Sequence, residues 1–202
     1  MKVYLIRHGE TDMNIEHRLQ GRTDWPLNEN GRRQARGARK ELQQRGVTCD
    51  RIYCSPLDRA LETCELVSGV SRDDFIIDDR IIEMNMGAYE TLVYEDLGEA
   101  FMHSYFKDPE HYQPPEGGED YHTLIARVGD FLDELAEKRP GESVLVVSHG
   151  GAIHAMLAYI EGIDLADFWK QRVGNCSIFE LSLTGGSFTV TAKDDRKDTF
   201  AE

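Results

Sequence analysis

The stretch Val3-Tyr4-Leu5-Ile6-Arg7-His8-Gly9 changes from an apolar run to polar residues within one step. Four consecutive apolar or aromatic residues are typical of a strand that is buried on both faces of a sheet. The stretch Val144-Leu145-Val146-Val147-Ser148-His149-Gly150 repeats this arrangement far along the chain. Because the carboxyl ends of parallel strands meet at one edge of an open α/β sheet, we expect His8 and His149 to share a pocket there.

Helical and strand patterns alternate along most of the chain. A helix is expected over residues 29–45, with Asn28 as its N-cap and Gly46 as its end. The next helix follows a short strand at 52–54 and is expected to begin with Ser55 as N-cap and Pro56 at the first position. Further strands are expected at 75–77, 144–147, 177–181 and 187–191, and further helices at about 119–138, 152–160 and 165–172.

This alternation predicts an α/β fold, built as a three-layer α/β/α sandwich. The central sheet is expected to be mostly parallel, with an antiparallel hairpin at one edge around the turn Thr184-Gly185-Gly186. That edge could pair with a second copy of the chain, so a homodimer is one arrangement that the sequence allows.

A chain of 202 residues suits one domain with a substantial core and is too short for two ordinary ones. Prolines and paired glycines interrupt the pattern between about residues 84 and 121. We therefore expect a single domain over residues 1–202, in which residues 84–121 are an insertion that forms a lid over the active site. The charged tail from Lys193 to Glu202 is expected to fray.

The net charge of −14 argues against nucleic acid or an anionic membrane as a partner, since both require a basic surface. An anionic substrate would have to be attracted by a local basic cluster. No targeting segment or membrane span is expected, because Arg7 interrupts the first apolar run after four residues. The four cysteines show no CxxC spacing, which favours reduced thiols and a cytoplasmic protein.

The residue types at the strand ends suit phosphate chemistry. The planar guanidinium of Arg7 matches phosphate oxygens, and Arg59 lies one turn into the second predicted helix, where its side chain can point back over the strand end. A neutral His8 can act as a nucleophile if a backbone carbonyl such as that of Gly9 binds its other ring nitrogen. With His149 and the glycines that follow it at a helix N-terminus, these residues predict a site for a tetrahedral oxyanion.

Several motifs together resemble those of one known family, the histidine phosphatase superfamily with its phosphoglycerate mutase-like fold. In chain order they are Arg7-His8-Gly9-Glu10-Thr11; Leu19-Gln20-Gly21 with Asp24 and Pro26-Leu27; Ser55-Pro56-Leu57 with Arg59-Ala60 and Thr63; Glu83 with Gly87 and Tyr89-Glu90; and Ser148-His149-Gly150. The resemblance covers nearly the whole chain. Thr91 departs from it, since a glycine is common at that position, and this affects the expected loop shape more than the chemistry.

The resemblance implies a role for each matching residue. His8 would be the nucleophile that becomes phosphorylated, and Glu83 would be the proton donor, with Glu10 and Glu90 as alternative carboxyl groups. Protonated His149 would share the charge of the phosphate with the arginines, and no metal or cofactor would be required. The residues assigned to the phosphate-binding set are Arg7, Asn14, Gly21, Arg59, His149 and Gly150.

The composition of the lid favours phosphatase activity over mutase activity. Between Ile81 and Ala126 the only Lys or Arg is Lys107, beside ten acidic and seven aromatic residues. Such a lid disfavours the second phosphate of a bisphosphorylated intermediate and suits a neutral or apolar leaving group, although the aromatic residues could equally be the lid's own core. The chain thus resembles the broad-specificity phosphatases of the family: an acid-type histidine phosphatase acting on small-molecule phosphate monoesters.

Other functions remain open on the sequence alone. A phosphoglycerate-type phosphomutase and a non-catalytic phosphoryl-binding regulatory module are the main alternatives. Cys54 and Arg59 loosely match the loop of cysteine-dependent phosphatases, with spacing one residue short. His8, Glu10, Asp12 and His149 are acceptable metal ligands, although the nearby arginines would repel a cation. Five further histidines are expected to be solvated or packed, with only a weak indication that His17 and Arg22 touch a substrate: His17, His103, His111, His122 and His154.

Overall fold

The computed structural model describes residues 1–139 and 141–194, so most of the tail predicted to fray lies outside the described residues. Six strands form one sheet in the order β3-β2-β4-β1-β5-β6. The strands are β1 (Lys2–Arg7), β2 (Arg51–Cys54), β3 (Ile76–Ile77), β4 (Ser143–Ser148), β5 (Ile178–Thr184) and β6 (Ser187–Ala192).

The pairing within this sheet is mixed in the predicted way. β1 pairs parallel with β4, and β2 pairs parallel with both β3 and β4. β5 pairs antiparallel with β1 on one side and with β6 on the other, so the final hairpin forms one edge. The predicted α/β class with a mostly parallel sheet and an antiparallel edge hairpin is confirmed.

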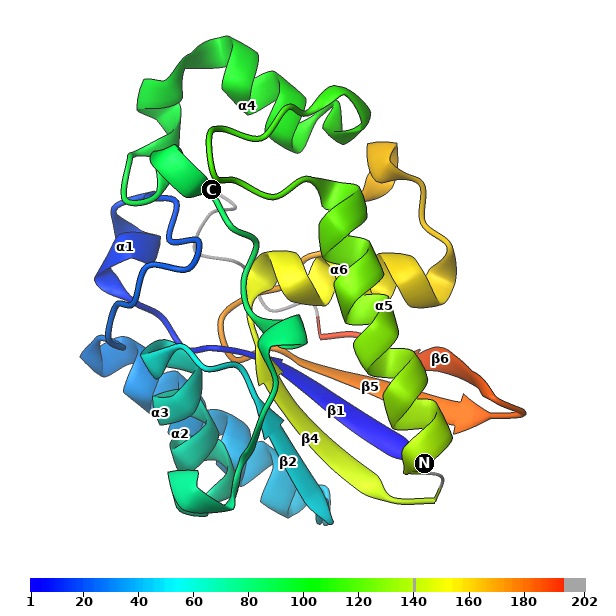
Figure 1. Ribbon diagram of the computed structural model, residues 1–202. Helices are drawn as coiled ribbons and strands as arrows, with labels where there is room; N and C mark the ends of the chain where they lie inside the picture. The colour runs from blue at the N-terminus through cyan, green and yellow to red at the C-terminus, as the bar shows by residue number, and fades with distance from the viewer. Residues whose placement is uncertain (140, 195–202) are drawn as a thin grey trace.

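Helices cover both faces of the sheet (Figure 1). They are α1 (Asp12–Ile15), α2 (Glu29–Gln44), α3 (Asp58–Ser68), α4 (Gly98–Phe106), α5 (Tyr121–Lys138) and α6 (Gly150–Glu161). Successive residues of β1 point to opposite faces: Val3 and Leu5 join the core on the side of α5 and α6, whereas Tyr4 and Ile6 join the core on the side of α2 and α3. The apolar residues of β1 are therefore buried on both faces of the sheet, as predicted for a central strand.

Helix α2 begins and ends where the sequence predicts. The side chain of Asn28 accepts a hydrogen bond of 2.8 Å from the backbone N–H of Gly31, which closes the N-terminal turn. The chain leaves the helix at Gly46 with a φ of 66°, a left-handed conformation that glycine adopts without a steric penalty.

The predicted start of helix α3 is wrong. The helix begins at Asp58 after Leu57, which makes no side-chain cap. Its first free amide, that of Asp58, instead donates to Asp24 Oδ1 at 2.9 Å, so the cap comes from a distant loop. Ser55, the predicted cap, follows the last residue of β2, and its side chain binds His149 in the candidate site described below.

Residues 84–121, the segment predicted to form a lid, lie above the end of the sheet where β1 and β4 finish (Figure 1). This segment contains α4 and short 3₁₀ helices at Gly87–Tyr89, Tyr94–Leu97 and Pro109–His111. Its aromatic side chains pack on one another: the ring centroid of Tyr105 lies 5.3 Å from those of Tyr112 and Trp169. The predicted helix at 165–172 is reduced to a 3₁₀ turn at Leu165–Asp167, and the Trp169 indole that follows donates to the Tyr105 carbonyl at 2.9 Å.

Thr91 has a φ of 70°, a left-handed conformation that is unusual for a β-branched residue. Its N–H donates to the Leu19 carbonyl at 2.7 Å, which ties the lid to the loop after α1. A glycine would adopt this conformation freely, so the backbone itself explains why a glycine suits the position.

Within residues 1–139 and 141–194, every helix is either too short or too polar to cross a lipid bilayer.

Two glycines of α2 provide a matched test of close packing at the end of β1. A Cβ on Gly31 would collide with the backbone of Glu10, whereas a Cβ on Gly37 would meet nothing within 4 Å. We expect Gly31→Ala to lower the free energy of unfolding by about 2 kcal/mol or more through this collision. Gly37→Ala should raise it by about 0.5–1 kcal/mol, because alanine is the better helix former. Urea unfolding of both variants measures the difference, and equal effects would contradict the close contact.

Candidate active site

The register of β1 and β4 places two histidines next to each other. Arg7 pairs with Ser148 at the last position of the parallel ladder, and the N–H of His8 donates to the Ser148 carbonyl at 2.9 Å. His8 and His149 therefore emerge side by side, with ring centroids 5.2 Å apart. The two imidazoles are adjacent, as the pattern of strand ends predicts, and of the two His8 borders the pocket.

His8 is held as a neutral ring with one nitrogen free for chemistry. Its Nδ1 lies 2.7 Å from the carbonyl oxygen of Gly9, so Nδ1 carries the hydrogen and Nε2 keeps its lone pair. Burial, together with the charges of Arg59 and Arg7, lowers the pKa of His8 well below its ordinary value. A neutral imidazole with a fixed tautomer is a competent nucleophile near neutral pH.

His149 is bound by the serine that was expected to cap α3. Ser55 Oγ lies 2.6 Å from His149 Nε2, and burial followed by Arg59 and His8 lowers the pKa of His149 well below its ordinary value. This lowered pKa disfavours the protonated His149 that the resemblance implies. When Ser55 donates to Nε2, the hydrogen of the neutral ring is on Nδ1, which can donate to an anion without a positive charge.

Two arginines lie beside the histidines. Arg7 Nη1 donates to the Val173 carbonyl at 2.6 Å. Arg59 is fully buried, and its Nη1 and Nη2 donate to the carbonyls of Thr23 and Gly21 at 2.8 and 2.7 Å. Burial lowers the pKa of Arg59 to about 10, which leaves it charged at neutral pH. Hydrogen bonds to backbone carbonyls thus fix the orientation of both guanidinium groups.

Three buried nitrogens around this cluster have no hydrogen-bond partner in the described part of the chain. They are Asn14 Nδ2, Arg59 Nε and His149 Nδ1. A buried donor without a partner costs about 1–3 kcal/mol, so a cluster of such donors beside a pocket indicates a bound ligand or water that satisfies them. Three donors from three different segments, beside a free imidazole nitrogen, match the oxygens of a phosphate group.

Glu83 is the carboxyl group of this pocket. Its Oε1 accepts from the N–H of Met84 at 2.8 Å and of Ala152 at 3.2 Å, and its Oε2 accepts from the N–H of Gly151 at 3.2 Å. His149 at the N-cap of α6 makes no side-chain cap, so Glu83 takes that place at the positive end of the helix.

The two alternative carboxyl groups lie outside the pocket lining and have structural partners. Glu10 Oε1 accepts from the side-chain amides of Asn28 and Asn30, each at 3.0 Å, at the start of α2. Glu90 accepts from the N–H of Arg22 at 2.8 Å and from the Thr23 hydroxyl. Both carboxylates fix loops around the site, and neither borders the space beside His8.

The remaining predicted residues differ in what they present to the pocket. Asn14 lies in α1 and is oriented by its Oδ1, which accepts from the N–H of Thr11 at 3.0 Å. Gly21 borders the pocket with a φ of 50°, and its carbonyl accepts a hydrogen bond from Arg59 Nη2, so this glycine orients a guanidinium of the site. Gly150 is the first residue of α6, and a Cβ at this position would lie 3.4 Å from Arg7 Nε.

Further residues hold the site in place; Thr63 belongs to a motif noted in the sequence, whereas Asn175 carries no recognisable signal there. Asn175 Nδ2 donates to the His8 carbonyl at 3.0 Å, and Thr63 accepts from the N–H of Gly9 at 3.0 Å. His154, expected to be solvated or packed, is buried on α6, and its Nδ1 and Nε2 lie 2.7 and 2.8 Å from the carbonyls of Gly150 and Gln171. The spacing of α6, with a buried residue at nearly every position, is the one signal that could have placed His154 inside.

A cavity of about 150 Å³ is lined both by residues at the strand and helix ends, such as His8 and Arg59, and by side chains of the segment predicted as a lid. Its outer part is lined by apolar and aromatic side chains, with Arg18 as a further cation. The outer lining residues are Arg18, Leu19, Met84, Met86, Tyr94, Tyr105, Phe106, His154 and Trp169. The pocket therefore has an inner end for an anion and an outer end for an apolar or neutral group.

The structure gives little support to a cysteine-dependent phosphatase or to a metal site. Cys54 is fully buried in the core between the sheet and α2 and α3, away from the pocket lining. Among the described residues, no group of three or more His, Cys, Asp and Glu side chains is arranged to hold a metal ion. His17 stacks on Tyr94 and contacts Glu95, and neither His17 nor Arg22 lines the pocket.

Comparison with known proteins matches this geometry. Residues 3–196 match the model of the histidine phosphatase superfamily (branch 1). Phosphoserine phosphatase 1 of Hydrogenobacter thermophilus is 32% identical over 179 residues, covering 88% of this chain and 84% of that protein. The probable phosphoglycerate mutase GpmB of Escherichia coli is 34% identical over 181 residues, covering 88% and 83%. The structure of Bacillus stearothermophilus YhfR superposes with a TM-score of 0.86 at 30% identity, covering 98% of each chain.

The lowered pKa values of His8 and His149 predict a loss of stability on mild acidification. In the unfolded chain both rings take up protons below a pH of about 6.5, while the folded protein keeps them neutral. The unfolded state then binds more protons, so the free energy of unfolding falls by up to about 1.4 kcal/mol per pH unit for each ring.

Urea unfolding between pH 7 and 5.5 in phosphate-free buffer measures this slope. The His8→Asn/His149→Asn variant should show a clearly shallower slope than the unsubstituted protein. An unchanged slope would show that neither ring is held neutral by the fold.

Proposed function

The chain belongs to the histidine phosphatase superfamily (branch 1), and on that basis we propose that it is a metal-independent phosphomonoesterase that works through a phosphohistidine on His8. The observation that carries the proposal is the group of unpartnered buried donors, Asn14 Nδ2, Arg59 Nε and His149 Nδ1, beside the free Nε2 of His8. In this proposal, Arg7, Gly21 and Gly150 complete the phosphate-binding set. The class is a phosphoric monoester hydrolase of the acid type.

In the first step, His8 Nε2 attacks phosphorus in line with the ester oxygen. The N–P bond forms, the P–O bond to the leaving group breaks, and protonated Glu83 transfers its proton to the departing oxygen. Arg7, Arg59 and the Nδ1–H of His149 stabilise the charge on the three equatorial oxygens. The products are an alcohol, phosphohistidine and the Glu83 carboxylate.

In the second step, the Glu83 carboxylate takes a proton from a water molecule whose oxygen attacks phosphorus. The N–P bond breaks, inorganic phosphate forms, and His8 returns to its neutral state. Glu83 is again protonated and ready for the next substrate. The hydrogen bonds that Glu83 accepts from Gly151 and Ala152 hold its carboxyl group at the start of α6, where it borders the pocket.

Phosphatase rather than mutase activity is supported by the outer part of the pocket. A mutase must bind a second phosphate, yet Lys107 in the lid is exposed and does not line the pocket. Arg18, the one cation among the outer lining residues described, already donates to Glu16 at 2.6 Å and to the Thr91 carbonyl at 2.8 Å. This aromatic and apolar surface favours a leaving group without a second phosphate.

The names of the relatives support a small phosphate ester as substrate but divide over the reaction, since one is a phosphatase and the other a probable mutase. The lid decides between them in this proposal, and the phosphomutase remains the second candidate because of the GpmB relative. Four free cysteines are consistent with a cytoplasmic setting.

The nucleophile is tested by hydrolysis of p-nitrophenyl phosphate in the presence of EDTA. The unsubstituted protein should turn over, and His8→Ala should lose about a thousandfold or more, because the covalent route is removed. An alkaline quench during turnover should leave phosphate on His8. His103→Ala, an exposed position on α4, serves as control and should keep full activity.

Activity that survives in His8→Ala would overturn the phosphohistidine mechanism, and activity that EDTA abolishes would overturn metal independence.

The outer pocket predicts discrimination against a second phosphate. We expect kcat/KM for fructose 1,6-bisphosphate to be about tenfold or more below that for fructose 1-phosphate, since the second phosphate loses hydration without gaining a free cation. Release of inorganic phosphate measures both. Incubation with 3-phosphoglycerate should yield phosphate and no 2-phosphoglycerate, whereas isomerisation would favour the mutase.

A further inference from the structure

Glu83 lies in a segment that makes almost no regular secondary structure. The last 3₁₀ turn before it ends at Ile81, and the next begins at Gly87. The backbone of residues 80–85 is nevertheless fixed, because side chains from other elements bind its polar groups. Ser148 Oγ at the end of β4 donates to the Ile81 carbonyl at 2.7 Å, and one arginine binds two further carbonyls.

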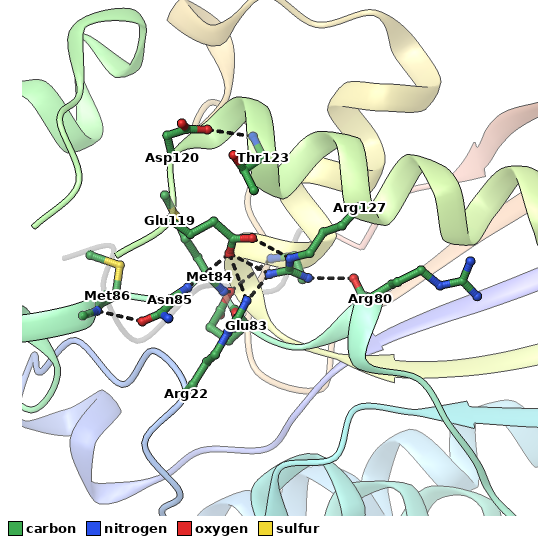
Figure 2. A network of polar contacts seen from close by, with 12 residues as sticks. Arg22, Arg80, Glu83, Met84, Asn85, Met86, Glu119, Asp120, Thr123 and Arg127 are labelled. Atoms are coloured by element: carbon green, nitrogen blue, oxygen red, sulfur yellow. Dashed lines mark hydrogen bonds and ion pairs between the residues drawn. The ribbon is translucent and has the colours of Figure 1, made fainter. Parts of the chain in front are cut away.

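That arginine is Arg127 on α5 (Figure 2). Its Nη1 donates to the Arg80 carbonyl at 2.6 Å, and its Nη2 donates to the carbonyl of Glu83 at 3.1 Å. The backbone of the residue assigned as proton donor is therefore held directly by a charged side chain. A hydrogen bond from a charged donor to a fixed carbonyl is stronger than a neutral one.

Arg127 is itself oriented by Glu119, at the end of the lid. Arg127 Nε and Nη2 donate to the two carboxylate oxygens of Glu119 at 2.7 and 2.9 Å, which is a bidentate pair (Figure 2). Glu119 also binds both backbone polar groups of Asn85. Its N–H donates to the Asn85 carbonyl at 2.9 Å, and its Oε2 accepts from the Asn85 N–H at 3.2 Å. Both side chains are largely buried, at 15% and 7% exposed.

A third segment reaches the same point. Arg22, in the loop whose carbonyls bind Arg59, places its Nε 3.4 Å from the Glu83 carbonyl and its Nη2 3.5 Å from Glu119 Oε2. The lid end, α5 and the phosphate-pocket loop thus all converge on the backbone of Glu83. On the other side, the Glu83 carboxyl is bound by the amides at the start of α6.

We infer that Arg127, held by Glu119, is a positioning residue for proton transfer by Glu83. The inference rests on the proposed function, in which Glu83 is the acid and base. Arg127 lies outside the pocket lining, so it acts through the Glu83 backbone. A displacement of about 1 Å in a catalytic group can cost about a hundredfold in rate, which makes this anchorage kinetically important.

The test uses two substrates that differ in their need for a general acid. The p-nitrophenolate of p-nitrophenyl phosphate leaves readily as an anion, whereas the alkoxide of glycerol 2-phosphate needs a proton. Because kcat/KM reports the steps up to phosphorylation of His8, it isolates the transfer of that proton. The variants are Arg127→Lys, which keeps the charge but loses the planar fork, and Glu83→Gln.

We expect Arg127→Lys to lower kcat/KM for glycerol 2-phosphate by about a hundredfold, and for p-nitrophenyl phosphate by less than about threefold. Glu83→Gln should show the same pattern with a larger loss. The double variant should lose no more than Glu83→Gln alone, because a displaced acid and a missing acid have the same consequence. Competitive inhibition by inorganic phosphate should stay unchanged in Arg127→Lys.

Arg32→Gln is the matched control, since Arg32 makes a similar two-pronged pair with Glu62 between α2 and α3, at 2.6 and 3.4 Å. It should leave both substrates unaffected. If Arg127→Lys does not fold, Glu119→Gln carries the test, because it removes the charge that orients Arg127 at nearly constant shape. It should reproduce the selective loss on glycerol 2-phosphate.

Equal losses on both substrates, or additive losses in the double variant, would overturn the positioning role. A Glu83→Gln variant without selectivity for the alkyl substrate would instead overturn the assignment of Glu83 as the acid. An unsubstituted protein that hydrolyses neither substrate would overturn the proposed function itself. The three failures therefore give different patterns.

Discussion

Two arginines and two histidines lie buried together at one end of the sheet, and the surrounding structure is arranged to hold them there. Crowding such groups in a region of low polarity costs free energy unless their polar atoms are bound. Backbone carbonyls supply that binding: Gly9 for His8, Val173 for Arg7, and Gly21 with Thr23 for Arg59. Burial keeps the two rings neutral, so only the arginines remain charged.

Much of the fold, and the centre of the site, follow from local patterns in the sequence. The apolar run of β1 predicts a central strand, and parallel pairing then brings His8 and His149 together whatever the intervening chain does. Ser55 shows the limit of such reasoning. It has the residue type and position of a helix cap, but its partner His149 lies 94 residues away, and Asp24 caps α3 instead. The hydrogen bonds by which Arg127, oriented by Glu119, holds the Glu83 carbonyl could not be predicted from the sequence either. They depend on how the segment after α4 returns to the sheet.

The position of Arg7 and Arg59 explains how a strongly acidic chain can bind the anionic substrate proposed for it. A net charge of −14 repels anions over the surface as a whole, but that repulsion is screened over about 8–10 Å at ordinary ionic strength. Arg7 and Arg59 act within contact distance and in a region of low polarity, where their attraction is stronger. Lys107, the only Lys or Arg between Ile81 and Ala126, is exposed and does not line the pocket, so in the proposed function the attraction is strongest at Arg7 and Arg59, where a single phosphate would bind.

The backbone strain at Thr91 lowers the stability of the fold, and a single substitution could remove it. A β-branched residue in left-handed backbone carries strain of about 1–2 kcal/mol, and the protein carries it at the joint between the lid and the loop after α1. A change to glycine there would release part of that strain without touching the pocket. The stability gained by such a change would offset the cost of a destabilising substitution among the aromatic residues that line the pocket. A substitution of that kind would change which leaving group the pocket accepts.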